Sequence, residues 1–260
     1  MYLQLKSISK VFQETDKETL QDISLTVEKG EFICIVGPSG CGKSTLLNLV
    51  AGLDTPSEGL IILDGNKVEG PGADRVVMFQ EAALYPWLNV MENVMFGLAA
   101  AGHDRNTQCE IAERYLRMVQ LWHYREYPIH QISGGMKQRT ALARALALDS
   151  KLLLMDEPFS ALDKQTINIL RAELEEIWEQ TKKTILYVTH SVEEAVYFAD
   201  RVVVMAENPG RIKEIIPIDL PRPRNIEEEK FTVIRKRILD QVQLSARKSM
   251  AEEFDEEDHS

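Results

Sequence analysis

The sequence predicts an α/β fold with a mostly parallel core sheet. The main observation is a set of short, almost wholly apolar runs, typical of strands buried on both faces: FICIV (32–36), VVMF (76–79), LLLM (152–155), TILYV (184–188) and VVVM (202–205). The second observation is that helical patterns lie between them, at 108–119, 135–148 and 166–180. Strands that alternate with helices favour parallel pairing, with helices covering the sheet.

The two ends of the chain follow other patterns. Apolar and polar residues alternate near the start, which predicts half-exposed antiparallel strands, through Leu3, Leu5, Ile8, Val11 and Phe12 and again through Ile23, Leu25 and Val27. Near the other end, PIDLPRPR (217–224) is typical of an extended connector, and 226–249 predicts one or two amphipathic helices before an acidic tail. We therefore expect a domain over 1–217 and a C-terminal segment over 218–260.

Charge and composition exclude several classes. The chain has 30 Lys and Arg against 41 Asp and Glu, a net charge of −11, and six of the acids lie in residues 251–260. Such acidity argues against nucleic acid as a partner. With 44% hydrophobic residues, the chain is typical of a soluble globular protein, and its longest apolar run, 94–101, is shorter than the roughly 20 residues a membrane span needs. The N-terminus does not resemble a signal peptide, and three cysteines favour a reducing cytosol.

Residues 37–45, GPSGCGKST, match the pattern G-x-x-x-x-G-K-[ST] between the strand FICIV and the helical LLNLVAG. Glycines at 37, 40 and 42 let backbone amides converge on a polyphosphate at a helix N-terminus. We expect Lys43 to reach the β- and γ-phosphates and Ser44 to ligate Mg²⁺. The pattern predicts an ATP-type phosphate site.

Polar residues follow three of the other predicted strands, where open α/β sheets place their ligands. Asp156 is expected to hold Mg²⁺, and Glu157 to accept a proton from the water that attacks the γ-phosphate. His190 is interpreted either as a contact to the γ-phosphate or the water, or as a cap or turn residue. Gln80 is interpreted either as a Mg²⁺ ligand that senses the γ-phosphate or as an ordinary strand-end amide.

Taken in order, these motifs resemble the ATP-binding subunits of ABC transporters, which have the P-loop NTPase fold. The resemblance covers residues 2–220 and rests on six elements: the Walker A loop (37–45), Gln80, the signature ISGGMKQR (132–139), the Walker B strand (152–157), SALD (160–163) and His190. It implies a helical subdomain over roughly 81–150 that carries the signature.

The resemblance also assigns contacts to individual residues. On the nucleotide's own subunit they are Phe12, stacked on adenine where the family more often has Tyr, and the loop residues Gly37, Pro38, Ser39, Gly40, Cys41, Gly42, Lys43, Ser44 and Thr45. Contacts to the ATP of the opposite subunit fall on Ser133, Gly134, Gly135, Met136 and Asp163. Ile132 and Met136 replace the more usual Leu and Gln, so the contact at Met136 is expected to be less polar.

The implied partners are a second copy of the chain or a related ATPase subunit, two membrane permease subunits and, indirectly, an extracytoplasmic solute-binding protein. The implied location is the cytoplasmic face of the cell membrane, as a peripheral protein. Residues 71–98, 133–139 and 208–224 look most like importers of nitrate, sulfonate, taurine, bicarbonate or related small solutes. Residues 83–87, ALYPW, either dock a permease helix or merely cover the helical subdomain.

Other interpretations remain open at this point. One is a soluble ABC-type ATPase that acts on nucleic acid or ribosomes; another is a P-loop kinase or GTPase, for which NKVE (66–69) gives only a superficial signal. Cys41 is either a reactive thiol, because a helix N-terminus lowers a thiol pKa, or an inert filler. The C-terminal helix, with Phe231, Ile234, Ile238 and Val242 at helical spacing, is either a regulatory or dimer-supporting appendage or a helix packed on its own domain.

Overall fold

The computed structural model describes residues 1–12, 17–160 and 162–257, with side chains for all of these except Lys17 and 246–257. Two compact units emerge: Met1–Pro71 together with Thr184–Ser260 (unit 1), and Gly72–Lys183 (unit 2). The predicted helical segment 81–150 falls within unit 2, and the C-terminal segment falls within unit 1. The boundary near residue 217 stays a prediction.

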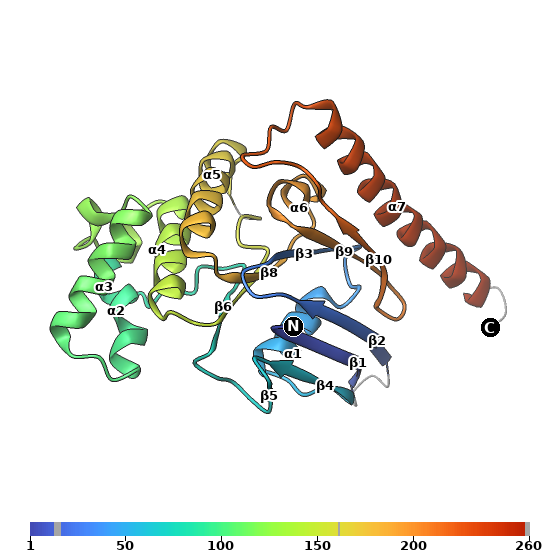
Figure 1. The fold of residues 1–260 in the computed structure, drawn as a ribbon, viewed down its shortest axis with the longest axis horizontal. Helices are drawn as coiled ribbons and strands as arrows, with labels where there is room; N and C mark the ends of the chain where they lie inside the picture. Colours follow the sequence, from blue (N-terminus) through green and yellow to red (C-terminus); the bar gives the residue numbers. More distant parts are fainter. Residues whose placement is uncertain (13–16, 161, 258–260) are drawn as a thin grey trace. The chain divides into compact units, whose positions relative to one another are not determined.

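The described residues of unit 1 form strands of two sheets and three helices (Figure 1): β1 (Leu3–Phe12), β2 (Lys17–Val27), β3 (Phe32–Val36), α1 (Lys43–Ala51), β4 (Glu58–Leu63), β5 (Asn66–Lys67), β8 (Thr184–Val188), α6 (Val192–Phe198), β9 (Arg201–Ala206), β10 (Arg211–Pro217) and α7 (Glu229–Glu257). In one sheet the strand order is β2-β1-β4-β5, and β1 runs antiparallel to both β2 and β4. The predicted N-terminal antiparallel sheet is thus confirmed.

The second sheet of unit 1 is organised around β3, whose five residues are all buried. It pairs in parallel with β8 on one side, Phe32 opposite Ile185, and with β9 on the other, Ile33 opposite Arg201. Strand β10 then adds antiparallel to β9. A fully apolar strand fits this position because both faces and both edges are covered.

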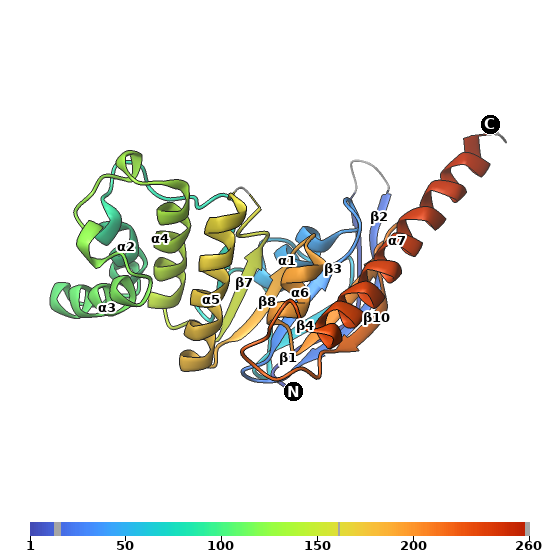
Figure 2. The ribbon, with the colours of Figure 1, turned by 90° about the horizontal axis from the view of Figure 1, so that it is seen from above.

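The C-terminal segment is anchored to unit 1. Helix α7 lies beside α6 and β9 (Figures 1 and 2), with Phe231 and Ile238 fully buried, as the interpretation of a helix packed on its own domain expects. In the connector before it, the buried Arg224 guanidinium donates to the carbonyls of Val196 (2.7 Å) and Ala199 (2.7 Å), where α6 ends. These bonds satisfy helix carbonyls that have no partner within the helix.

In unit 2 the described elements are a parallel strand pair and a group of helices: β6 (Arg75–Met78), α2 (Val90–Ala100), α3 (Arg105–Met118), the short 3₁₀ turns Trp122–Tyr124 and Ile129–Gln131, α4 (Gly134–Ala147), β7 (Leu152–Asp156) and α5 (Lys164–Thr181). Helices α2, α3 and α4 pack on one another (Figure 2), and α4 also packs against β6. Strand β6 lies at the end of its sheet, so Val76 and Val77 are only half-buried, unlike the prediction of a strand buried on both faces.

Sequence patterns did not reveal every element. The stretch 94–101 forms most of α2, and β4, β10 and α6 carried no prediction. The predicted one or two C-terminal helices are a single helix, α7. Within the described residues, no helix combines the length and apolarity that a membrane span requires.

Candidate functional site

The predicted phosphate loop connects β3 to α1 in unit 1. Helices α2 to α6 each begin at an Asn, Asp or Ser whose side chain accepts a backbone N–H, whereas α1 begins at Gly42 and has no side-chain cap. Gly42 has φ +87°, and a Cβ there would lie 2.6 Å from Leu20 Cδ2, so only glycine fits. The first turn of α1 therefore presents backbone amides that no side chain of the helix cap satisfies, as a phosphate site requires.

Lys43 is the buried cation of this loop, with 7% of its surface exposed. Its ammonium donates to the carbonyls of Gly37 (3.0 Å) and Pro38 (2.7 Å), so the lysine closes the loop on itself. Ser44, the next residue, is exposed at the start of α1. The loop therefore contains both its cation and the carbonyls that hold this cation in place.

Of the two interpretations given to Cys41, burial favours the inert filler over the reactive thiol. It is 1% exposed, and burial raises the pKa of its thiol, although the neighbouring Lys43 ammonium acts in the opposite direction. Desolvation disfavours the thiolate more than the nearby cation favours it. The interpretation of Cys41 as an inert filler is the one that the geometry supports.

His190 lies near the loop because of the strand register. Ile35 in β3 is opposite Val188 in β8, and the Thr189 amide donates to the Ile35 carbonyl (3.1 Å), so His190 leaves β8 beside the start of the phosphate loop. Its side chain is exposed. Phe12, at the end of β1, is 39% exposed, with the Lys10 ammonium 5.0 Å from its ring centroid. Its exposure is compatible with the predicted adenine stack.

In unit 2 the predicted hydrolytic residues lie at the carboxyl ends of neighbouring parallel strands. Met78 is opposite Met155, and each of Gln80 and Glu157 follows two residues later in its own segment. Asp156 and Glu157 are half-buried, and Gln80 is exposed. Glu157 has φ +45°, an uncommon value for a residue with a side chain, and such backbone strain is found most often at functional sites.

The signature residues stand at the exposed N-terminus of α4. The Ser133 hydroxyl accepts the Met136 amide (3.3 Å) as the helix cap. A Cβ on Gly135 would lie 2.8 Å from Thr166 Cγ2, so glycine at this position lets α4 approach the start of α5. Asp163 caps α5, and the hydrogen bond from the Thr166 hydroxyl holds the pKa of its carboxyl below the usual value. Of the SALD motif, Ala161 lies outside the described residues.

Two interpretations were given to the segment 83–87: it docks a permease helix, or it covers the helical subdomain. Tyr85 and Trp87 differ in this respect. Tyr85 is half-buried, with its ring centroid 4.2 Å from that of Phe96, so it does cover the helical part of unit 2. Trp87 is 74% exposed and covers little. A groove of about 400 Å³ runs alongside, lined by Val76, Val77, Met78, Phe79, Ala82, Ala83, Tyr85, Phe96, Gly97, Ala141, Arg144, Ala145 and Leu148.

Two structural supports of this groove were not predicted from the sequence. Asn93 is fully buried in α2; its side chain accepts the Tyr85 amide (2.8 Å) and donates to the Asn89 carbonyl (2.9 Å). The Arg144 guanidinium donates to the carbonyls of Ala82 (3.0 Å) and Ala83 (2.8 Å). The capping box at Asn89 and Glu92 was a visible signal for α2, but the contacts of Asn93 and Arg144 had none.

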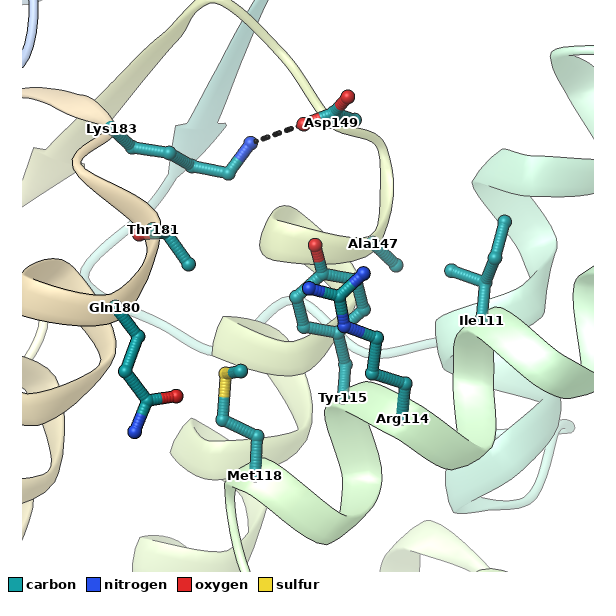
Figure 3. A pocket seen from close by; sticks show the side chains of 9 residues that line it. All are labelled: Ile111, Arg114, Tyr115, Met118, Ala147, Asp149, Gln180, Thr181 and Lys183. Atoms are coloured by element: carbon teal, nitrogen blue, oxygen red, sulfur yellow. Dashed lines mark hydrogen bonds and ion pairs between the residues drawn. The ribbon is translucent and has the colours of Figure 1, made fainter.

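A second cavity of unit 2, of about 380 Å³, lies at the carboxyl ends of α4 and α5 (Figure 3). The signature is at the other end of α4. Lys183 reaches toward Asp149 (3.1 Å), and Arg114 lies against the ring of Tyr115, 5.5 Å from its centroid. Helices α3, α4 and α5 all end here, so these cations face helix carboxyl ends, which accounts for them without a ligand. Because α4 has 14 residues, the cavity is about 20 Å from the signature.

The predicted Mg²⁺ ligands all present oxygen donors. Ser44, Gln80 and Asp156 offer hydroxyl, amide and carboxylate oxygens, the donors that Mg²⁺ prefers beside phosphate and water. In the part of the chain that the structure describes, no three or more His, Cys, Asp or Glu side chains group as a metal site. The residues present fit a cation that is held largely by nucleotide phosphates.

Comparison with known proteins gives consistent findings. The family model described as ABC transporter matches residues 20–160. The chain is 50% identical over 250 residues to an uncharacterised ABC transporter ATP-binding protein of Methanocaldococcus jannaschii, covering 95% of this chain and 94% of the relative. It is 47% identical to the nitrate import ATP-binding protein NrtD of Synechocystis, covering 85% and 84%.

A further relative is the aliphatic sulfonates import ATP-binding protein SsuB of Bacillus cereus, 42% identical, with 94% of this chain and 96% of the relative covered. Among solved structures, a dimeric ATP-binding cassette in a post-hydrolysis state, bound to ADP and Pi, matches with a TM-score of 0.73 and 29% identity. That match covers 84% of this chain and all of the cassette.

Proposed function

Because the chain belongs to the ABC transporter family, whose ATP-binding cassettes bind and hydrolyse ATP to power transport, we propose that it drives import of a small solute through a separate membrane permease. Relatives named for nitrate and aliphatic sulfonate import support a solute among nitrate, sulfonates, taurine, bicarbonate and similar small molecules. The proposed location is the cytoplasmic face of the membrane, with a solute-binding protein as an indirect partner.

The observation that carries this proposal is a pair of helix N-termini in one chain, one uncapped beside a buried lysine and one exposed at the signature. Helix α1 begins with uncapped amides and the buried Lys43, and α4 begins at the exposed Ser133. In the proposed two-fold dimer, ATP is held by Lys43 of one protomer and Ser133 of the partner subunit. Two equivalent sites then form at one isologous interface.

In this dimer, different residues would have different roles in ATP hydrolysis. Glu157 accepts a proton from the attacking water, and His190 contacts the γ-phosphate or that water. Ser44, Gln80 and Asp156 would hold Mg²⁺, which neutralises charge on the phosphate oxygens. Loss of the γ-phosphate removes the link between Lys43 and Ser133 of the partner subunit, so the dimer reopens.

The permease contact is proposed at the groove beside 83–87. Exposed aromatic side chains border it, with Phe79 and Phe96 each 45% exposed and Trp87 74% exposed. Apolar surface of this kind, rimmed by polar groups, is typical of a protein interface. Reopening of the dimer would move this surface and the permease helix docked on it.

The test is the variant Glu157→Gln. We expect it to bind ATP with unchanged affinity, to lose hydrolysis and to elute as an ATP-dependent dimer in size-exclusion chromatography. Unimpaired hydrolysis would refute the catalytic assignment.

A second experiment tests the transport role. The wild type is used as bait for a pull-down from solubilised membranes, and its retention by ribosomes and DNA is measured for comparison. Retention by ribosomes or DNA without a permease would overturn the transport role.

A further inference from the structure

Helix α4 carries a buried amide side chain that belongs to none of the predicted contacts. Gln138 lies five residues after Ser133 and is 4% exposed. Its Nε2 donates to the backbone carbonyl of Gln80 (3.0 Å) and to that of Pro158 (2.5 Å). One side chain of the signature helix therefore bonds to the segments that follow β6 and β7.

The orientation of this amide is determined by its partners. The NH₂ group has two hydrogens, and each is donated to one carbonyl; the flipped amide would place Oε1 against two carbonyl oxygens. Oε1 is buried and has no hydrogen-bond partner in the described part of the chain. A buried side chain that donates to carbonyls of two separate segments fixes their spacing, which indicates a geometric task in addition to packing.

The two carbonyls lie next to the predicted chemistry. Gln80 itself is the expected Mg²⁺ and γ-phosphate contact, and Pro158 directly follows Glu157. The register Met78 opposite Met155 brings these segments side by side, and Gln138 spans them. Glu157 has φ +45°, a conformation that persists only when surrounding contacts hold it.

We propose that Gln138 is a positioning residue: it fixes the Gln80 segment, the peptide after Glu157 and the signature helix in one arrangement. The proposal rests on the proposed ATPase function. Through these two bonds, a displacement of the Gln80 segment shifts the backbone beside Glu157 and the N-terminus of α4 together. Gln138 touches no substrate; it acts through the carbonyls of Gln80 and Pro158.

The first test compares Gln138→Leu with a control on the same helix, Thr140→Val. Thr140 is fully buried, and its hydroxyl donates only within α4, to the Met136 carbonyl (2.8 Å). We expect Gln138→Leu to lower kcat roughly 10- to 100-fold, because misplaced catalytic groups cost rates of this order, with the Kd for ATP within twofold of wild type. Thr140→Val should keep kcat within threefold at a similar loss of Tm.

A second pair of variants separates hydrogen bonding from packing. Gln138→Glu keeps the shape but removes both donors, so it should lose kcat as Gln138→Leu does. Gln138→Lys supplies donors and no acceptor, so it should retain at least a third of the wild-type kcat per nucleotide-binding site. A packing role predicts the reverse order, with Leu more active than Lys.

Each outcome decides one question. Equal kcat in Gln138→Leu and Thr140→Val at matched Tm, or greater activity of the Leu than of the Lys variant, overturns the positioning role. A wild-type chain that binds ATP but hydrolyses none, alone or with its permease, refutes the proposed function instead. Activities are normalised to nucleotide-binding sites, so a misfolded fraction does not imitate a lower kcat.

Discussion

The residues predicted to contact phosphate differ between the two units in burial and in helix capping. In unit 1, Lys43 and Cys41 are buried, the loop carbonyls accept from the lysine, and α1 has no side-chain cap. In unit 2, Ser133 and Asp163 are exposed and serve as caps of their own helices. The loop in unit 1 has its cation and the lysine's hydrogen-bond partners within one chain segment, whereas the residues in unit 2 lie on an exposed surface. We infer that the surface gains its function from a second molecule.

The largest expected effect separates the two sites directly. Lys43→Met removes the charge that is expected to reach the β- and γ-phosphates and should weaken ATP binding roughly 1,000-fold, since charge-assisted bonds of this kind contribute about 1.5–3 kcal/mol each. Ser133→Arg, on the exposed site, should leave the ATP affinity of the monomer unchanged and abolish the ATP-dependent dimer. Equilibrium titration with ATP and size-exclusion chromatography measure the two effects. Equal loss of monomer affinity in both variants would contradict the comparison.

The next effect compares two arginines that bond to backbone carbonyls. Arg224 in unit 1 is 6% exposed and donates to the carbonyls of Val196, Tyr197, Ala199, Ile218 and Leu220. Arg224→Met should lower the free energy of unfolding by roughly 3–4 kcal/mol, because several carbonyls lose their donor. Arg144→Met, which loses the bonds to Ala82 and Ala83 and the contact with the Tyr85 ring (5.7 Å to its centroid), should cost roughly 1–2 kcal/mol.

Urea unfolding followed by circular dichroism measures both variants. If the Arg144 variant were less stable than the Arg224 variant, the predicted ranking would be wrong. The stability of unit 2 would then depend more on Arg144 than its hydrogen bonds indicate. Lys236→Met, an exposed cation of α7, serves as the matched control and should change stability by no more than about 0.5 kcal/mol.

A smaller effect concerns the groove of unit 2. Trp87→Ala should change the free energy of unfolding by no more than about 0.5 kcal/mol, because the side chain is 74% exposed. The same change should weaken permease binding at least about tenfold, as truncation of an aromatic anchor does. ATP hydrolysis by the isolated chain should be unaffected. Unchanged permease affinity in a binding assay with detergent-solubilised permease would place the contact elsewhere.

The smallest expected effect is a difference in labelling rate. Cys109 in α3 is half-exposed, whereas Cys41 is buried and has a raised thiol pKa. Because a raised pKa leaves less thiolate at neutral pH, maleimide should modify Cys109 at least about tenfold faster, and the rate at Cys41 should rise as the pH increases. Peptide mass spectrometry over time measures this order. Faster labelling at Cys41 would restore the reactive-thiol interpretation.

The sequence predicted the parts of the molecule whose determinants are local. The loop GPSGCGKST and the buried strands FICIV, LLLM, TILYV and VVVM contain their signals within a few residues, and the structure has these elements where expected. The half-exposed β6 departs from the pattern because its burial depends on its place at the sheet edge, which an apolar run alone does not encode.

What the sequence did not predict depends on contacts between distant residues. Gln138 was visible inside the signature, but its bonds to the carbonyls of Gln80 and Pro158 span 58 and 20 positions. The sequence left two interpretations of Cys41 open for the same reason: a helix N-terminus is a local signal, whereas the burial that raises the pKa of the thiol arises from the fold around it. Roles assigned to the site residues stay predictions until the variants are measured.

The parallel pairing of β3 also determines when, during synthesis of the chain, this strand can gain its neighbours. Its neighbours β8 and β9 begin at Thr184 and Arg201, about 150 residues later in the chain, while unit 2 is one uninterrupted segment between them. As the chain leaves the ribosome, unit 2 emerges whole before β3 gains either neighbour, and a nascent chain ending before Thr184 lacks both. Domains generally fold as they emerge, so we expect nascent chains to retain nucleotide only after β8 and β9 are exposed, measurable on stalled ribosomes.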